Sequence, residues 1–259
     1  MDLSVITVTW NSKENITEQI SSVILGSKQI SFEQIIVDNG STDDTVSIVE
    51  THCNASLRLI KNATNLGFSA ANNQAAALAR GEFILFLNPD MRVEEGSLDK
   101  LLNWMREHPD VGIAGCKLVD AQGKFKEKAA PRRFPTLLNQ LAIILKLPHL
   151  LPSLLDKYLY KGFNPDKEQE VDSVRGSFLI MRHELYKKLG FAFDPRYFIW
   201  FEDVDLCREA KRLDYKVIYA PVVSCVDHVG ASFSKRNFFW KQFQFTKSMI
   251  KYFLKWKNY

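Results

Sequence analysis

Two hydrophobic periodicities alternate along the first 115 residues of the chain. Short runs rich in Val, Ile, Leu and Phe predict strands at residues 3–9, 34–37, 57–60, 83–87 and 111–115. Apolar residues three and four positions apart predict helices over 13–25, 69–79 and 95–107, and one that starts from a cap at Ser41 or Thr42 and ends near His52. Strands separated by such helices form βαβ units. We therefore predict an α/β protein with a mostly parallel sheet that helices cover on both faces.

Four of the predicted strands lead into short polar clusters that favour turns. The clusters are Thr9-Trp10-Asn11, Asp38-Asn39, Asn65-Leu66-Gly67 and Asn88-Pro89-Asp90. Ligands of open α/β sheets bind at the carboxyl ends of the strands. We therefore expect the four clusters to converge on one binding edge.

The second half of the chain has a different pattern. It predicts a hairpin over 117–131, a Leu-rich segment over 134–160, a long strand over 171–181, a helix from Glu202 to about Leu213, and strands over 215–219 and 221–226 that lead to His228. The sequence contains no internal repeat and no low-complexity linker. We expect one domain over residues 1–232 and a C-terminal extension over 233–259.

Acidic residues at the ends of the predicted strands are candidate ligands for a nucleotide. The two oxygens of Asp38 can accept hydrogen bonds from a base or a ribose, although Asp38 equally suits a turn that caps the next helix. Asp90, at the end of Asn88-Pro89-Asp90, follows a buried strand, where Mg²⁺ or Mn²⁺ on a diphosphate would be a fitting partner. An ordinary Pro-Asp turn is the alternative.

Three acids open the predicted helix that begins at Glu202. They are Glu202, Asp203 and Asp205, and the helix dipole favours negative charge at this end. Capping accounts for one acid rather than three, and the apolar run 197–201 precedes them. We therefore favour a pocket wall that holds a general base. The neighbours of His228 in the sequence fit both a ligand and a surface residue.

Composition narrows the class of protein. Hydrophobic residues make up 46% of the chain and charged residues 25%, which excludes a disordered, collagen-like or coiled-coil protein. The longest mostly apolar stretch, 137–155, is broken by Lys146, Pro148 and Pro152, so we predict no membrane-spanning helix. The first residues lack a signal-peptide pattern. The four cysteines are far apart, which fits neither a zinc site nor a disulfide framework, so we expect reduced thiols in a cytosolic protein.

The segment from Lys235 to Tyr259 is basic and aromatic. It holds seven Lys or Arg, nine aromatic residues and no acid, in a chain whose net charge is only +4. On a helical wheel, Lys241, Lys247, Lys251 and Lys255 lie opposite Phe239, Phe243, Ile250, Phe253 and Leu254. This pattern is typical of an interfacial helix on an anionic membrane, with residues 134–155 as a second apolar surface. Packing of both segments on the domain is one alternative, and single-stranded nucleic acid is another anionic partner.

Seven motifs, taken in order, resemble those of family 2 glycosyltransferases with the GT-A fold. The matching segments are residues 5–11, 37–45, 65–73, 87–90, 176–180 and 201–207, and His228 with Ser232. The Asn-Pro-Asp variant and the Glu-Asp-Val-Asp-Leu-Cys run resemble bacterial rhamnosyltransferases, which move L-rhamnose from dTDP-rhamnose onto lipid-linked or polysaccharide acceptors. Residues 132–135 and the Leu-rich segment after them resemble the branch that acts on N-acetylglucosaminyl-diphospho-polyprenol.

The resemblance implies roles for residues on the donor side. Thr9 and Asp38 would line the nucleoside pocket, and Gly67 would let the backbone approach this pocket closely. Asp90 would bind the divalent cation, Mg²⁺ or Mn²⁺, on the donor diphosphate. The metal motif of the family is usually Asp-x-Asp, so Asn88 is a departure. It implies either a contact to the ribose or a weaker metal ligand.

The resemblance implies that His228 is a further ligand of the metal or the diphosphate of the donor. On the acceptor side it implies that Asp203 is the general base. We expect an inverting glycosyltransferase of bacterial cell-surface glycan synthesis, such as O-antigen or cell wall, at the cytoplasmic face of the membrane. Its acceptor would be polyprenyl-diphosphate-linked or a glycan. The alternatives are a UDP-sugar donor (galactofuranosyl or N-acetylhexosaminyl) and a non-catalytic nucleotide-sugar binder, which would not need Asp203. These motifs argue against a nucleic-acid partner.

Overall fold

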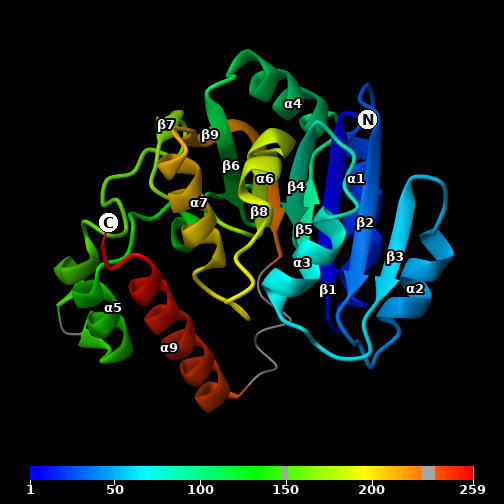
Figure 1. The fold of residues 1–259 in the computed structure, drawn as a ribbon. Coiled ribbons are helices and arrows are strands. Elements are labelled where there is room, and N and C mark those ends of the chain that lie inside the picture. Colours follow the sequence, from blue (N-terminus) through cyan, green and yellow to red (C-terminus); the bar gives the residue numbers. More distant parts are fainter. Residues whose placement is uncertain (148–150, 229–236, 259) are drawn as a thin grey trace.

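One central sheet organises the computed structural model, which describes residues 1–147, 151–228 and 237–258 (Figure 1). The N-terminal half of the sheet consists of β1 (Leu3–Thr9), β2 (Phe32–Asp38), β3 (Leu57–Lys61) and β4 (Phe83–Leu87). These strands are parallel and lie in the order β3-β2-β1-β4. Their pairing matches the predicted βαβ units, and it brings all four carboxyl ends to the same edge.

The C-terminal half of the sheet is mixed. β8 (Phe178–Arg182) is antiparallel to both β4 and β6 (Val111–Val119), whereas β9 (Lys216–Asp227) is parallel to β6. β5 (Met91–Val93) and β7 (Gln169–Glu170) are short strands antiparallel to β9. The prediction of a mostly parallel sheet therefore holds for the N-terminal half, and the other half departs from it.

Two strand predictions in this half are wrong in extent. The strand predicted over 171–181 begins only at Phe178, because Ser173 pairs with Arg132 instead of joining the sheet. The strands predicted over 215–219 and 221–226 form one continuous strand, β9. Pro221 is tolerated there because it falls where the pairing of β9 with β6 is irregular, so its missing N–H disturbs no regular ladder.

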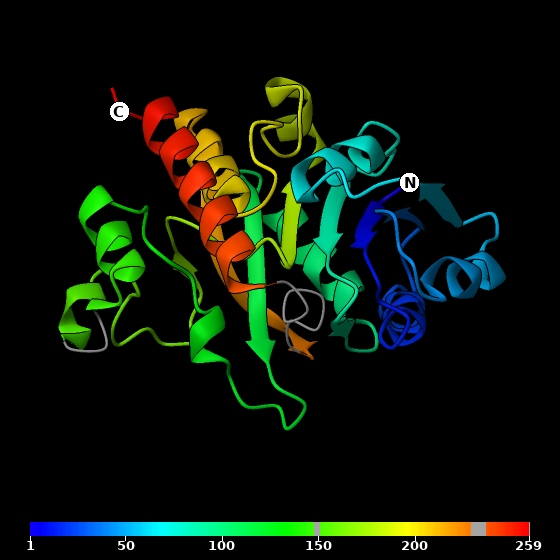
Figure 2. The same cartoon turned by 90° about the horizontal axis from the view of Figure 1, so that it is seen from below.

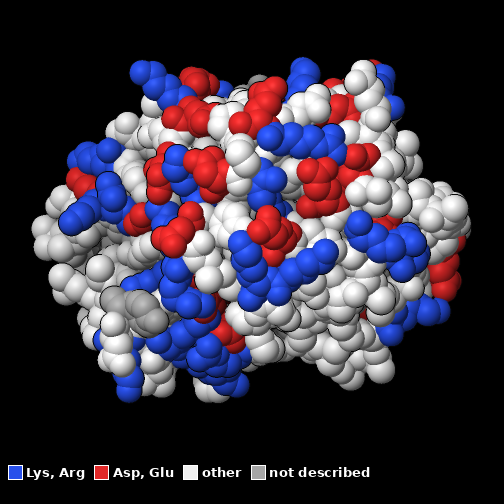
Figure 3. All heavy atoms as spheres, turned by 45° about the horizontal axis from the view of Figure 1, so that its top comes forward, with Lys and Arg blue, Asp and Glu red and all other residues white. Residues whose placement is uncertain are grey.

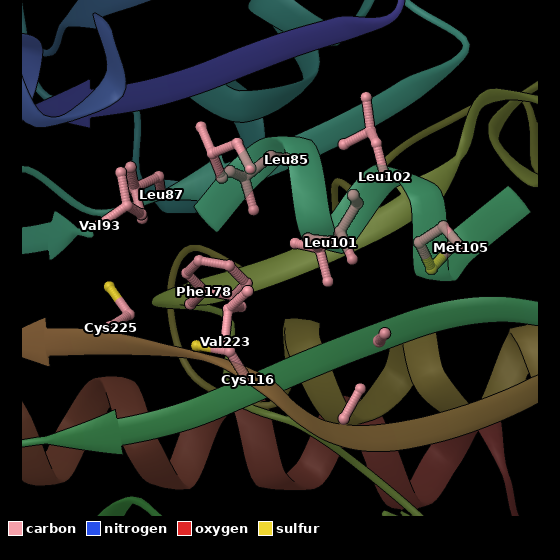
Figure 4. Packing of buried hydrophobic residues seen from close by; sticks show 14 of the residues in the cluster. Leu85, Leu87, Val93, Leu101, Leu102, Met105, Cys116, Phe178, Val223 and Cys225 are labelled. Carbon is pink, nitrogen blue, oxygen red and sulfur yellow. The ribbon is translucent and has the colours of Figure 1, made fainter. Parts of the chain in front are cut away.

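Helices cover both faces of the sheet, as predicted. α1 (Ile16–Gly26), α2 (Thr45–His52) and α4 (Ser97–Glu107) lie on one face, and α3 (Phe68–Ala76), α6 (His183–Leu189) and α7 (Glu202–Arg212) lie on the other. Figure 4 shows the core beneath α4, where Leu85, Leu101 and Phe178 point toward one another. α2 begins later than its predicted cap, because the Ser41 amide donates to Asp38 instead.

The C-terminal helix α9 (Phe238–Lys255) packs beside α7 and near α5 (Leu137–Ile144), as Figures 1 and 2 show. Tyr252 is fully buried, and Met249 and Trp256 are nearly so, in a cluster with Tyr197 and Phe201. The predicted helix therefore exists, and one of its faces belongs to the core. No helix within the described ranges combines the length and the apolar character that crossing a bilayer requires.

A buried cluster of charges joins α9 to α7. The Lys255 ammonium lies 2.9 Å from Asp194, 2.6 Å from Asp205 and 2.8 Å from Glu209. Burial opposes the charge of Lys255, yet these carboxylates together raise its pKa. Asp194 and Glu209 each also pair with an arginine, whereas no other cation of the described residues pairs with Asp205. The side of the helix that carries the lysines was predicted to face a membrane, but at Lys255 it faces the protein.

We expect Lys255→Met to lower the free energy of unfolding by about 3–5 kcal/mol, the usual cost of leaving a buried charge without its partner. The loss should be larger at pH 8 than at pH 5. An unpaired buried carboxyl has a raised pKa, so the native state holds a proton that the unfolded state releases, and stability falls as the pH rises. Urea unfolding at both pH values measures the effect, with Lys257→Met, an exposed position, as the control. Equal stability of the two variants would contradict this role for the cluster.

Candidate active site

A first cavity, of about 220 Å³, lies at the carboxyl edge of the parallel strands. All four predicted polar clusters contribute to its wall, through Thr9, Trp10, Asn39, Asn65, Gly67, Asn88, Pro89 and Asp90. Ser177, Phe198, Ile199, Asp227 and Trp240 come from the second half of the chain. The convergence expected from the strand ends is therefore present in the structure.

The carboxylate of Asp38, at the end of β2, accepts hydrogen bonds from other groups of the protein. It accepts from the Thr9 hydroxyl at 3.1 Å and from the Ser41 amide at 2.9 Å, and the side chain is buried. Thr9 lines the first cavity, whereas Asp38 lies behind it and forms the turn that the sequence left open as an alternative. The neighbouring Asn39 reaches the cavity wall.

Asn39 joins two loops at this edge. Its amide group donates to the Asn65 side chain and to the Gly67 carbonyl, both at 3.2 Å, and its oxygen accepts from the Leu66 amide at 2.9 Å. Gly67 has a φ of 90°, and a Cβ there would lie 2.6 Å from the carbonyl oxygen of Phe198. Glycine is needed for this approach. At Gly67 the loop before α3 therefore lies against the loop before α7, whereas the approach of this backbone to a nucleoside stays a prediction.

Asn88 and Asp90 line the first cavity, and the backbone of His228 lies next to that of Asp90. The His228 amide donates to the Asp90 carbonyl at 3.0 Å, which brings together two residues that are far apart in the sequence. Asp227 lines the cavity too, because the pairing of β5 with β9 brings it close to Asp90. Ser232, the last residue of the family motifs, lies outside the described residues.

The side chains at this end of the cavity suit a divalent cation that also binds phosphate oxygens of a ligand. Asp90 and Asp227 line the cavity with carboxylate side chains, the group that Mg²⁺ and Mn²⁺ prefer, and the Asp227 carboxylate also pairs with the Lys126 ammonium at 2.9 Å. The described part of the chain has no group of three or more His, Cys, Asp or Glu side chains suited to a metal. Two carboxylates are enough for Mg²⁺, because this ion usually binds one or two carboxylates and completes its coordination shell with phosphate oxygens and water.

A second cavity, of about 150 Å³, lies next to the first, and the segments 175–177 and 198–201 contribute to both. Asp203 lines the second cavity from the first turn of α7. Its carboxylate accepts from the Gly176 amide at 3.1 Å and from the Val204 amide at 2.8 Å. A Cβ on Gly176 would lie 3.2 Å from the Cβ of Asp203, so glycine makes room for this contact. These bonds fix the carboxylate near the boundary of the two cavities.

The three acids at the start of α7 have different surroundings. Burial, together with the charge of Asp203, raises the pKa of Glu202 well above its usual range, which favours its neutral form. Asp205 is fully buried and accepts from Lys255 and from the indole of Trp256. Asp203 is partly exposed at the cavity wall. Of the three, Asp203 is placed to take a proton from a bound molecule.

Several residues of the cavities were not predicted from the sequence. Ser177, Phe198, Asp227 and Trp240 line the first cavity. Trp240 belongs to α9, as does Phe245 in the wall of the second cavity, so both sides of the predicted boundary at residue 232 contribute to the walls. An aromatic residue of an amphipathic helix gives the same sequence signal whether it packs on protein or on lipid. The contribution of α9 to the cavity walls is therefore visible only from the position of this helix in the structure.

Known proteins with similar sequences and structures include several glycosyltransferases. The chain is 28% identical over 244 residues to the N-acetylglucosaminyl-diphospho-decaprenol L-rhamnosyltransferase of Mycobacterium tuberculosis, covering 89% of this chain and 77% of that protein. The structure of S. aureus TarS in complex with UDP-GlcNAc matches with a TM-score of 0.60 and 24% identity, over 92% of this chain and 62% of that one. A mannosyltransferase of Pyrobaculum calidifontis, in complex with GDP-Man and Mn²⁺, matches with a TM-score of 0.60 and 22% identity, over 89% and 58%.

The two solved proteins establish the fold, which is the GT-A fold, while this chain spans only about three fifths of their length. The family model described as Glycosyl transferase family 2 matches residues 4–190, well over half of the chain. The matched range contains every predicted donor-side residue from Thr9 to Asp90, and Asp203 follows shortly after it. The chain therefore belongs to glycosyl transferase family 2 and is a glycosyltransferase.

Proposed function

We propose that this enzyme transfers L-rhamnose from dTDP-rhamnose to a polyprenyl-diphosphate-linked sugar or a growing glycan in bacterial cell-surface glycan synthesis. One observation carries the proposal: the polar cavity at the strand ends adjoins a second cavity whose wall holds the carboxylate of Asp203. The choice of rhamnose rests on the likeness to the mycobacterial rhamnosyltransferase. A UDP-sugar is the second candidate donor, because the similar TarS was solved with UDP-GlcNAc.

The proposed reaction divides its tasks between the two cavities. Thr9, Asn39 and the loop at Gly67 bind the nucleoside part of the donor in the first cavity. Asp90 and Asp227 would hold Mg²⁺ or Mn²⁺ beside His228, and such a cation neutralises charge on the departing diphosphate.

Asp203 accepts the proton of the acceptor hydroxyl as its oxygen attacks the anomeric carbon. One base and direct attack invert the configuration at that carbon. Asn88 remains available to the ribose, because its neutral amide is a weaker metal ligand than a carboxylate.

We expect Asp203→Asn to bind the donor within a few-fold of the wild-type affinity and to lower kcat by about 10²-fold or more, the usual effect of losing a general base. Donor affinity and transfer of labelled sugar are measured on the same preparation. Glu107→Gln, at an exposed acid at the end of α4, is the matched control and should keep both values. Near-normal turnover of the Asp203 variant would assign the base to another residue.

Thermal shift with dTDP-rhamnose, UDP-galactofuranose and UDP-GlcNAc, each with and without Mg²⁺, identifies the donor and its cation. A ligand at 100 times its Kd stabilises the native state by about 2.7 kcal/mol, so the true donor should stand out. Asp90→Ala should abolish the effect of Mg²⁺ on donor binding, and His228→Ala should weaken binding. Glu94→Ala, at an exposed acid just after β5, should leave both unchanged. An Asp90 variant that still responds to Mg²⁺ would place the cation elsewhere.

We also infer that the exposed faces of α5 and α9, together with residues 145–147 and 153–159 and Leu151, bind the anionic surface of a membrane. They carry an apolar surface that is unusually exposed, with Leu138 at 77% and Phe239 at 82%. The large exposed apolar side chains of this surface are Leu137, Leu138, Leu141, Leu145, Leu147, Leu151, Leu154, Leu159, Phe238, Phe239, Phe243, Ile250 and Leu254. An apolar patch of this kind marks an interaction surface.

Charge favours a lipid partner for this surface. α9 contains no acidic residue, and Lys247 and Lys257 are exposed on and beyond it. Figure 3 shows that acidic and basic side chains are interspersed over much of the face that it presents. Each Lys or Arg near an anionic bilayer contributes about 1 kcal/mol of attraction, and burial of apolar side chains adds to it.

The test of membrane binding uses point substitutions, because deleting α9 would also remove Tyr252 and Lys255 from the core. The triple variant Phe239→Ser, Phe243→Ser and Leu254→Ser should lose most of its binding to phosphatidylglycerol vesicles in a flotation assay and keep its melting temperature. Binding of the wild type should weaken with added salt. The control replaces Leu25 and Leu78, which are exposed elsewhere, with serine. Unchanged flotation of the triple variant would rule out this surface.

A further inference from the structure

Arg132 and Arg175 line the second cavity, and neither has a role in the chemistry described above. A backbone bridge holds their two segments together. The Arg132 amide donates to the Ser173 carbonyl at 3.3 Å, and the Ser173 amide donates to the Arg132 carbonyl at 3.1 Å. The Arg132 guanidinium also lies over the ring of Tyr158, 5.7 Å from its centroid. Two cations are therefore fixed in the wall that also holds Asp203.

Neither guanidinium forms an ion pair with a carboxylate of the described residues. Arg175 donates from Nη2 to the Lys128 carbonyl, while its Nε is buried and has no hydrogen-bond partner in the described part of the chain. Burial, together with the nearby charge of Arg132, lowers the pKa of Arg175 to about 10. The charge of Asp203 offsets part of this repulsion, but a buried donor without a partner and neighbouring like charges are still costly, and an anion between the two guanidinium groups would relieve both costs.

The charge balance of the cavity also favours an anion. The raised pKa of Glu202 favours its neutral form, which leaves the carboxylate of Asp203 against two guanidinium groups. Arginine presents a planar fork of donors that matches the oxygens of a phosphate group in pairs. A sugar hydroxyl at Asp203 and a phosphate at the arginines would therefore satisfy different parts of the same cavity.

The second cavity is continuous with the helices of the exposed apolar surface. Gln140 and Ile143 of α5 and Phe245 of α9 line the cavity, while Leu138 and Phe239 of the same helices are exposed. Figure 2 shows α5 and α9 next to each other along one side of the domain. A molecule with an apolar chain on these helices would thus have its next chemical group at the two arginines.

We propose that Arg132 and Arg175 form the subsite for the phosphate or diphosphate of a lipid-linked acceptor, between its chain on α5 and α9 and its sugar hydroxyl at Asp203. The inference rests on the proposed function in one respect, namely that the second cavity takes the acceptor. It also predicts a preference for acceptors that carry a phosphate group, because a neutral glycan would leave both guanidinium groups without an anion.

The test measures binding of farnesyl diphosphate, a short lipid diphosphate, by calorimetry in EDTA and without donor. Arg132→Gln and Arg175→Gln should each raise the Kd by about tenfold or more, the scale of a lost charge-assisted contact. Arg175→Lys should raise the Kd less, because lysine keeps the positive charge and lacks only the paired donors of the guanidinium group. Arg133→Gln is the matched control: Arg133 is adjacent and exposed, lies 4.5 Å from the Tyr160 ring centroid, and does not line the cavity. If Arg175→Gln does not fold, Arg132→Gln and Arg175→Lys decide the result.

Two further ligands show whether the site recognises a lipid diphosphate, a free diphosphate or the lipid chain alone. Farnesol should bind weakly and equally to wild type and variants, and inorganic pyrophosphate should bind more weakly than farnesyl diphosphate. Equal affinity of all arginine variants for farnesyl diphosphate would overturn the subsite, and pyrophosphate as tight as farnesyl diphosphate would overturn its lipid part. Because no donor, cation or turnover is involved, a negative result here leaves the proposed transfer reaction open, and a wrong donor sugar leaves this binding result intact.

Discussion

The buried contact between Lys255 and Asp205 is the interaction on which the arrangement of both cavities depends. It fixes α9 to α7, the helix that also carries Asp203. Once α9 is fixed, Trp240 completes the wall of the first cavity and Phe245 that of the second. This charged contact thereby helps to set the shape of the two cavities. The segment that the sequence suggests is a separate extension is therefore a structural part of the walls of both cavities.

The N-terminal half of the fold follows from the sequence because the hydrophobic period and the turn residues agree there at nearly every element, the start of α2 being the exception. Parallel strands then bring Thr9, Asn39, Gly67 and Asp90 to one edge without further information. The second half is harder, because β8 and β9 are ordered by contacts distant in sequence. Asp227 reaches the first cavity only through the pairing of β5 with β9, and β5 is too short to give a periodic signal.

The acids of α7 show how burial separates residues that the sequence treats alike. Glu202, Asp203 and Asp205 lie within one turn, and a sequence pattern gives them equal claim to a catalytic role. Glu202 is buried beside another charge, and Asp205 is buried with a cation, so each is committed to the interior. Asp203 keeps an exposed portion and takes its fixed orientation from the Gly176 amide. The sequence proposes Asp203 as the base only through the family resemblance, and what the structure adds is that Asp203 alone of the three is partly exposed at a cavity wall.

The two faces of α9 place different demands on evolution. Tyr252 and Trp256 fill the core, so selection for a stable fold is sufficient to keep them apolar. Phe239 and Phe243 on the outer face contribute little to folding, and selection for stability or solubility alone would let polar residues replace them during neutral drift. The membrane contact proposed above would supply a selective pressure that keeps them apolar, one that lies outside the folding of a single molecule. Among homologous chains, the outer face should stay apolar only where that external partner persists, while the inner face should stay apolar in all of them.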